Sequence, residues 1–226
     1  MNLRKSWWKW LGVILVGYTI LGGLLFEVPR LVILNESIRN LYFHVTMWFG
    51  MITLLTASVV YSVRYLSKQD PLMDVKALEF ANAGILFGLL GLVTGMLWAT
   101  YTWGEPWSGD PKQNSSAIAL LIYMAYLVLR NSLSDSQQRA RISSVYNVFA
   151  YAAMIPLLFI LPRMADSSLH PGNGGNPGFN YYDLDNKLRI VFYPAVIGWI
   201  LIGVWVTTLR IRMKSLKLKL INHTDQ

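Results

Sequence analysis

Long apolar runs recur along this chain, and they constrain its fold more than any other feature. Several runs reach about 17 residues, the length that an α-helix needs to cross the hydrocarbon core of a bilayer. Only 14% of the 226 residues are charged and 54% are hydrophobic. That charged share is about half of what a soluble domain carries. The sequence therefore predicts an all-α integral membrane protein.

The apolar runs predict six transmembrane helices, packed as a six-helix bundle in a single domain, residues 1–226. The expected spans are residues 10–26, 43–63, 80–101, 111–129, 145–161 and 190–209. The first run resembles a signal peptide but lacks a small-residue cleavage site, so it is expected to remain as a helix. The fourth span is long enough only if its helix begins at Pro111. Asp110 suits the N-cap there, and Gln113 suits the third position of a capping box.

The distribution of Lys and Arg predicts how the helices cross the membrane. With six spans, both termini share a side with the loops 64–79 and 130–144, and these segments hold 14 of the 20 basic residues. Both termini are therefore expected to be cytoplasmic, because cytoplasmic segments carry the excess of positive charge. The net charge of +8 is then a topology signal. The basic tail 210–226 is expected to lie at the lipid bilayer surface, and no nucleic-acid motif is present.

Unusual residues gather on the face opposite the termini. The loop between the third and fourth spans is TWGEPWSGDPKQ, residues 102–113, and the long loop 162–189 is rich in Gly, Pro and Asn, which predicts turns. Two of the three histidines belong to this face: His44 at the outer end of the second span and His170 in the long loop. His223 lies in the tail. Each histidine alone also has an ordinary explanation, such as a headgroup contact or a turn.

Four glycines mark one face of the third span. Gly84, Gly88, Gly91 and Gly95 are three or four residues apart, so they share a side of the helix. Small residues in such a stripe let two membrane helices approach closely. The pattern predicts tight helix packing.

Together the outer residues predict a haem site. Two histidines suit the two axial positions of a haem iron, and the indoles of Trp103 and Trp107 suit a porphyrin face. Arg39 and Lys112 suit the two propionates. Because the chain has no cysteine, covalent attachment through CxxCH is excluded, and the haem would be removable.

Other functions fit less well. A b-type cytochrome needs histidine pairs within its spans, and only His44 lies in one. A transporter of another small anion would be expected to carry ionisable residues inside the spans. A haem-free membrane scaffold stays open as an alternative.

The loop 102–113 resembles the tryptophan-rich WWD segment of the haem-handling membrane proteins of cytochrome c maturation. Here it is W-G-x-x-W-x-x-D-P-K, beginning at Trp103. The segments SIRNLYFHV and SLHPG resemble those that carry the two external histidines of these proteins. Over nearly the whole chain, the resemblance is to the CcmC family, haem exporter protein C.

This resemblance implies a haem carrier and not an enzyme, placed in the bacterial cytoplasmic (inner) membrane. It implies that haem b is bound transiently at the periplasmic face, with His44 and His170 as the axial ligands of its iron. The remaining implied binding residues are Trp103, Gly104, Trp107 and Asp110 in the platform, and Arg39 and Lys112 near the propionates. The implied partners are haem, a periplasmic haem chaperone of the CcmE type and an ABC transporter of the CcmA/CcmB type.

The motif departs from the family pattern in ways that leave an alternative open. Pro106 and Gly109 stand where the family usually has tryptophans. The Asp-Pro-Lys run is closer to the WWD segment of CcsA-type cytochrome c synthases. A haem-attaching synthase subunit is therefore the alternative to a carrier.

Overall fold

The computed structural model describes residues 3–31, 33–170 and 184–224, and within these residues every regular element is a helix. The elements are α1 (Leu3–Leu25), the short 3-10 helix η1 (Asn35–Asn40), α2 (Leu41–Lys68), α3 (Pro71–Trp103), α4 (Pro111–Ser132), α5 (Ser136–Phe159), α6 (Leu161–Met164) and α7 (Asn186–Thr224). Among the described residues, six helices are long and apolar enough to cross a membrane, which confirms the predicted number of spans.

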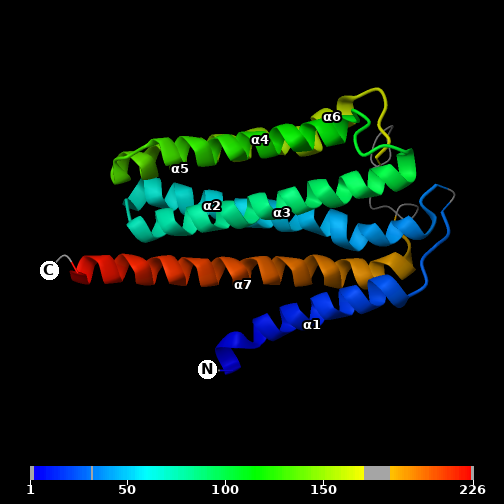
Figure 1. Cartoon of the computed structure of the whole chain (residues 1–226), viewed down its shortest axis with the longest axis horizontal. Coiled ribbons are helices and arrows are strands. Elements are labelled where there is room, and N and C mark those ends of the chain that lie inside the picture. The colour runs from blue at the N-terminus through cyan, green and yellow to red at the C-terminus, as the bar shows by residue number, and fades with distance from the viewer. Residues whose placement is uncertain (1–2, 32, 171–183, 225–226) are drawn as a thin grey trace.

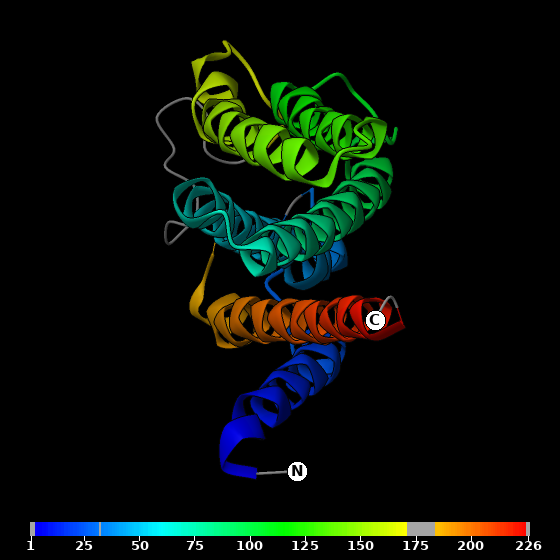
Figure 2. The same cartoon turned by 90° about the vertical axis from the view of Figure 1, so that its left-hand side faces the viewer.

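The helices run side by side in layers (Figure 1). The pair α4 and α5 lies on the pair α2 and α3, followed by α7 and then by α1, which packs against α7 (Figure 2). Both ends of the chain lie toward one end of the bundle, here called the terminal end. The opposite, far end holds the connections after α1, α3 and α5.

The helices extend past the predicted spans at the terminal end. The predicted tail 210–226 is a continuation of α7 as far as Thr224. At the far end, the predicted bounds of the loop, 162–189, are too wide, because α6 occupies the start of that range and α7 already begins at Asn186. Its Gly, Pro and Asn-rich stretch, residues 171–183, lies outside the described residues.

Glycines set the distance between α2 and α3. A Cβ atom added at Gly84 would lie 2.7 Å from the Cδ2 atom of Leu55, and one added at Gly88 would lie 2.6 Å from the Sδ atom of Met51. A side chain at either position would require these neighbours to move, so α3 and α2 approach closely where the stripe faces α2. The prediction of tight packing is confirmed.

Buried ion pairs join the helices near the terminal end. Arg130 in α4 makes a two-pronged contact with Asp74 in α3, at 2.7 and 2.6 Å. Glu79 of α3, 3% exposed, accepts from Arg210 at 2.6 Å and from Lys214 at 3.1 Å, both in α7. Charges buried inside the bundle are tolerated when each is paired, so the pairs hold α4 and α7 at defined positions along α3.

An apolar cluster fixes the far end. The segment after α1 and η1 contribute Val28 and Ile38, α2 contributes Tyr42, and α7 contributes Leu188 and Phe192, all buried. These contacts hold the first turn of α2 between two other segments. That turn contains the first of the two outer histidines.

The contact between α1 and α7 depends on Gly198. A Cβ atom there would lie 2.9 Å from the Cβ of Leu15 and 3.1 Å from the backbone nitrogen of Val16. We expect Gly198→Leu to destabilise the protein by about 1–3 kcal/mol, the usual cost of overpacking. Thermal unfolding in mild detergent measures it. Gly17→Leu is the control, because a Cβ at Gly17 meets nothing within 4 Å. Equal melting temperatures for the two variants would contradict the packing.

Candidate functional site

His44 lies in the first turn of α2, against the far-end half of α3. Its Nδ1 atom is 2.8 Å from the carbonyl oxygen of Gly91. A carbonyl can only accept, so Nδ1 carries the proton and Nε2 carries the lone pair. A Cβ atom at Gly95 would lie 2.5 Å from Cε1 of His44, so the imidazole fits only because residue 95 is glycine. Gly91 and Gly95, the two glycines of the stripe nearest the far end, therefore make room for Trp48 and His44 of α2.

Two tryptophans flank the His44 ring. The ring centroids of Trp48 and Trp98 are 6.2 and 5.8 Å from that of His44, both in edge-on geometry. Trp98 is held in turn by its Nε1–H, which donates to Ser37 Oγ at 3.0 Å. Edge-on aromatic contacts of this kind are favourable, so the imidazole is oriented by α2, α3 and η1 together.

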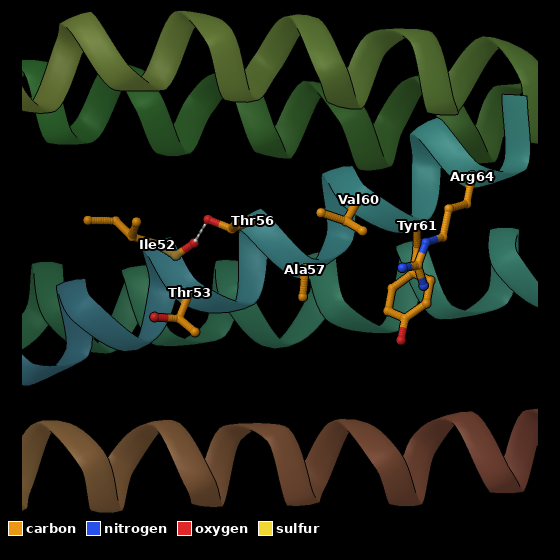
Figure 3. A pocket seen from close by; sticks show the side chains of 7 residues that line it. All are labelled: Ile52, Thr53, Thr56, Ala57, Val60, Tyr61 and Arg64. Atoms are coloured by element: carbon orange, nitrogen blue, oxygen red, sulfur yellow. Dashed lines mark hydrogen bonds between the residues drawn. The ribbon is translucent and has the colours of Figure 1, made fainter. Parts of the chain in front are cut away.

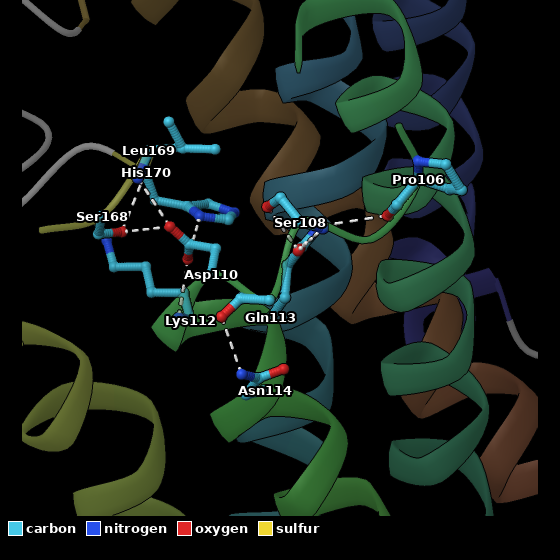
Figure 4. A network of polar contacts seen from close by, with 10 residues as sticks. Pro106, Ser108, Asp110, Lys112, Gln113, Asn114, Ser168, Leu169 and His170 are labelled. Atoms are coloured by element: carbon cyan, nitrogen blue, oxygen red, sulfur yellow. Dashed lines mark hydrogen bonds and ion pairs between the residues drawn. The ribbon is translucent and has the colours of Figure 1, made fainter. Parts of the chain in front are cut away.

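Asp110 contacts the segment that contains the second histidine, His170 (Figure 4). Its Oδ1 accepts from the backbone N–H of Lys112 at 2.8 Å, which confirms its predicted role as the N-cap of α4. Its Oδ2 accepts from Ser168 Oγ at 2.8 Å and from the backbone N–H of Leu169 at 2.7 Å. The same Oδ1 lies 2.8 Å from Nδ1 of His170. One carboxylate thus joins the start of α4 to the loop after α6.

The charge on Asp110 is stabilised by these donors. Burial favours the neutral acid, but the hydrogen bonds from His170, Ser168 and Leu169 outweigh it and hold the pKa of the carboxyl well below its ordinary value. The anchoring is therefore complete at neutral pH, and it is lost only as the pH falls through that lowered value.

His170 is oriented in the same way as His44. Because the partner of Nδ1 is a carboxylate, Nδ1 carries the proton and Nε2 carries the lone pair. The ring of Trp103, the last residue of α3, lies edge-on to His170 with centroids 4.8 Å apart. Trp98 beside His44 and Trp103 beside His170 both belong to the last turns of α3. The structure thus brings both histidines to the outer part of α3.

The loop between Trp103 and Asp110 is shaped by two other residues. Gly104 ends α3 with φ +86°, a left-handed conformation that favours glycine. Gln113 accepts from both the backbone N–H and the Oγ of Ser108, at 3.0 and 3.1 Å, and donates to the carbonyl of Pro106 at 3.3 Å. The predicted capping box is therefore wrong, because Gln113 holds the loop and does not pair with Asp110.

Two other predicted residues, Arg39 and Trp107, take no part in the hydrogen bonds and ring contacts described above for the two imidazoles, and Arg39 differs from its predicted role. Arg39 donates to the carbonyls of Gly23 and Phe26 at 2.9 and 2.7 Å and to Glu36 at 2.7 Å, so its guanidinium fixes the end of α1. Trp107 is 36% exposed on the loop.

Sequence reasoning missed several residues that position the imidazoles. These are Gly91, Gly95, Trp48, Trp98, Ser168 and Gln113. Two patterns gave a signal: the glycine spacing, which predicts only helix packing, and the spacing of Gln113 from Asp110, which predicts a capping box.

The arrangement supplies two imidazole nitrogens with free lone pairs. A histidine that binds a metal almost always donates its other ring N–H to a carboxylate or a backbone carbonyl, which fixes the ring. Both histidines make such a bond. Across the described residues, no group of three or more His, Cys, Asp or Glu forms a site for a bare metal ion.

Comparison with known families matches residues 1–222 to CcmC, heme exporter protein C. The chain belongs to the heme exporter protein C family. It is thus a multi-pass helical membrane protein of a bacterial cytochrome c biogenesis family, and the predicted resemblance to the CcmC family is confirmed.

Individual relatives agree with this family. Heme exporter protein C of Haemophilus influenzae is 26% identical over 92% of this chain and 82% of its own length. The protein of the same name from Bradyrhizobium diazoefficiens is 29% identical over 55% of this chain and 47% of its own. Cytochrome c biogenesis protein CcsA of Prochlorococcus marinus is 35% identical over a shorter stretch, 38% of this chain and 30% of its own.

The anchoring role of Asp110 can be tested against a matched carboxylate. Asp70 caps α3 as Asp110 caps α4. Each aspartate is followed by a proline, and each Oδ1 accepts at 2.8 Å from the backbone N–H of the residue after that proline. We expect Asp110→Ala to speed amide hydrogen exchange at Leu169 by roughly tenfold, because the lost bond is worth about 1–2 kcal/mol. Asp70→Ala should leave that amide unchanged. Equal exchange at Leu169 in both variants would contradict the anchoring.

Proposed function

We propose that this protein binds haem non-covalently at the far end of the bundle, with His44 and His170 as axial ligands, and delivers it to a periplasmic haem chaperone. One observation carries the proposal. Both imidazoles are tied through Nδ1, to Gly91 and to Asp110, so that both present the lone pair of Nε2. Imidazole is a common axial ligand of haem iron, and this tautomer is the one that ligates.

The number of ligands also favours haem as the cargo. Two imidazoles alone would leave a bare metal ion poorly coordinated, whereas a porphyrin supplies four in-plane nitrogens and needs only axial partners. The far end offers aromatic side chains beside each imidazole, Trp98 for His44 and Trp103 for His170. The residues present therefore fit a haem.

The other predicted binding residues take part in different ways. Trp103 and Asp110 orient His170, while Gly104 gives the loop the turn that carries Trp107 to the exposed surface. Trp107 is proposed to line the porphyrin, and Lys112 to hold a propionate.

The propionate role of Arg39 stays a prediction that its observed contacts do not support. Its Nε atom already donates to Glu36, and its Nη1 atom donates to the carbonyls of Gly23 and Phe26 at the end of α1. We propose instead that Arg39 acts on the site indirectly. It ties η1 to α1 five residues before His44.

Orientation and partners follow from the charge distribution and from the family. Segments at the terminal end hold most of the basic residues, so that end is placed in the cytoplasm and the far end faces the periplasm. The proposed location is the bacterial cytoplasmic membrane. Partners of the Ccm system, a chaperone of the CcmE type and an ABC transporter of the CcmA/CcmB type, would then meet the haem at the far end and drive its release.

A haem-attaching synthase is the second candidate. The similarity to cytochrome c biogenesis protein CcsA favours it, but the chain covers only 30% of that relative. Haem-free scaffolding is the third reading. Haem content separates the scaffold from both other functions, and covalent transfer to an apocytochrome separates the synthase from the carrier.

The haem assignment predicts a spectrum that depends on two histidines. Protein purified in mild detergent and supplied with haem should show a low-spin absorption spectrum with two nitrogen ligands. In His44→Ala and in His170→Ala, haem affinity should fall by at least about tenfold. Removing only the hydrogen-bond partner of a metal ligand already lowers metal affinity by about this factor, and these variants remove the ligand itself. His223→Ala, the third histidine, is the matched control and should keep the spectrum. A wild-type protein that takes up no haem would favour the scaffold.

The glycine that accommodates His44 gives an independent test. Gly95→Ala places a methyl group where the imidazole now lies, so the ring must move and haem affinity should fall about tenfold. Gly17→Ala, where the added methyl meets open space, should bind haem as the wild type does. Haem titration followed by absorption measures both. Equal affinities would show that His44 does not need its present position.

A further inference from the structure

A second candidate site lies on the membrane-facing side of α2, in the half of the bundle near the terminal end. A groove of about 490 Å³ runs along this helix. It is lined by Ile52, Thr53, Thr56, Ala57, Val60, Tyr61 and Arg64. Their spacing places them on one face of α2 over roughly 18 Å. In Figure 3 these residues lie along α2, with the α4/α5 layer on one side and α7 on the other.

The floor of the groove is apolar despite its threonines. Thr53 Oγ1 donates to the carbonyl of Phe49 at 2.8 Å, and Thr56 Oγ1 donates to that of Ile52 at 2.7 Å. Thr56 Oγ1 also lies 2.7 Å from the hydroxyl of Tyr151. Because these hydroxyls are satisfied within the protein, the threonines can offer methyl groups to a ligand. Such a floor suits a hydrocarbon chain.

Two cations stand at the end of the groove nearer the terminal end. The guanidinium carbon of Arg64 is 5.6 Å from the ring centroid of Tyr61, and Nζ of Lys76 is 5.2 Å from the same centroid. The Tyr61 ring is stacked on Phe80, with centroids 5.6 Å apart. Aromatic contacts hold the two cations but do not neutralise them.

Nearby carboxylates are engaged elsewhere. Asp74 pairs with Arg130, and Glu79 pairs with Arg210 and Lys214. None of the ion pairs between described residues includes Arg64 or Lys76. Arg64 and Lys76 are two like charges beside one ring. An anion bound between them would lower their mutual repulsion, and basic residues near a membrane surface attract anionic lipid.

We propose that the groove binds one anionic phospholipid of the adjoining leaflet, with its phosphate between Arg64 and Lys76 and one acyl chain along the α2 face. Charge complementarity and the apolar floor match the two parts of such a lipid. A haem would match the cations through its propionates, but no imidazole or thiolate lines the groove to ligate its iron. The inference does not depend on the haem site at the far end.

The test is native mass spectrometry of the delipidated full chain. The probes are phosphatidylglycerol and phosphatidylcholine with identical acyl chains. We expect one phosphatidylglycerol to bind the wild type more tightly than phosphatidylcholine. In the double variant Arg64→Gln/Lys76→Gln its affinity should fall roughly thirtyfold, the effect of two cations near a membrane surface. The control Lys68→Gln/Arg141→Gln removes two other exposed charges and should bind as the wild type does.

A second variant tests the acyl chain. Val60→Trp fills the groove without changing its charge. It should lower the affinity for phosphatidylglycerol at least several-fold. Equal binding of both lipids, equal losses in the two double variants, or full binding by Val60→Trp would each overturn the proposal. Displacement of the bound lipid by added haem, with haem uptake that depends on Arg64 and Lys76, would overturn it in favour of haem.

Discussion

The carboxylate of Asp110 is the interaction on which the arrangement of the far end depends. It caps α4 and, through the same two oxygens, holds Ser168, Leu169 and His170, which lie about 60 residues further along the chain. Nothing else in the described loop ties His170 to the helices with comparable geometry except the ring of Trp103. A conventional helix cap thus also determines where the second histidine lies and which of its nitrogens is free.

The first histidine is positioned by packing. The glycine stripe brings α3 against α2, and its outer part supplies both the Gly91 carbonyl and the space at Gly95. The histidines are therefore held by different means, one by backbone approach and the other by a buried charge. Both leave the same chemical result, a protonated Nδ1 and an available Nε2.

Much of this fold follows from the sequence, because length and hydropathy determine which segments can span a bilayer. The six helices, the N-cap at Asp110 and the packing role of the glycines were predictable for that reason. The partners of the polar side chains were not. The spacing between Asp110 and Gln113 suggested a capping box, but Gln113 turns to Ser108 and Pro106. Arg39 likewise donates to the carbonyls of Gly23 and Phe26, contacts that could be predicted only by knowing how α1 ends.

The central claim is that one haem iron is bound by Nε2 of His44 and Nε2 of His170 at the far end. A structure of the haem-loaded protein determined by electron cryomicroscopy tests it most directly. The account predicts both Nε2 atoms within bonding distance of the iron, with the Nδ1 contacts to Gly91 and Asp110 retained. Iron bound through either Nδ1, or a haem held away from both imidazoles, would contradict it.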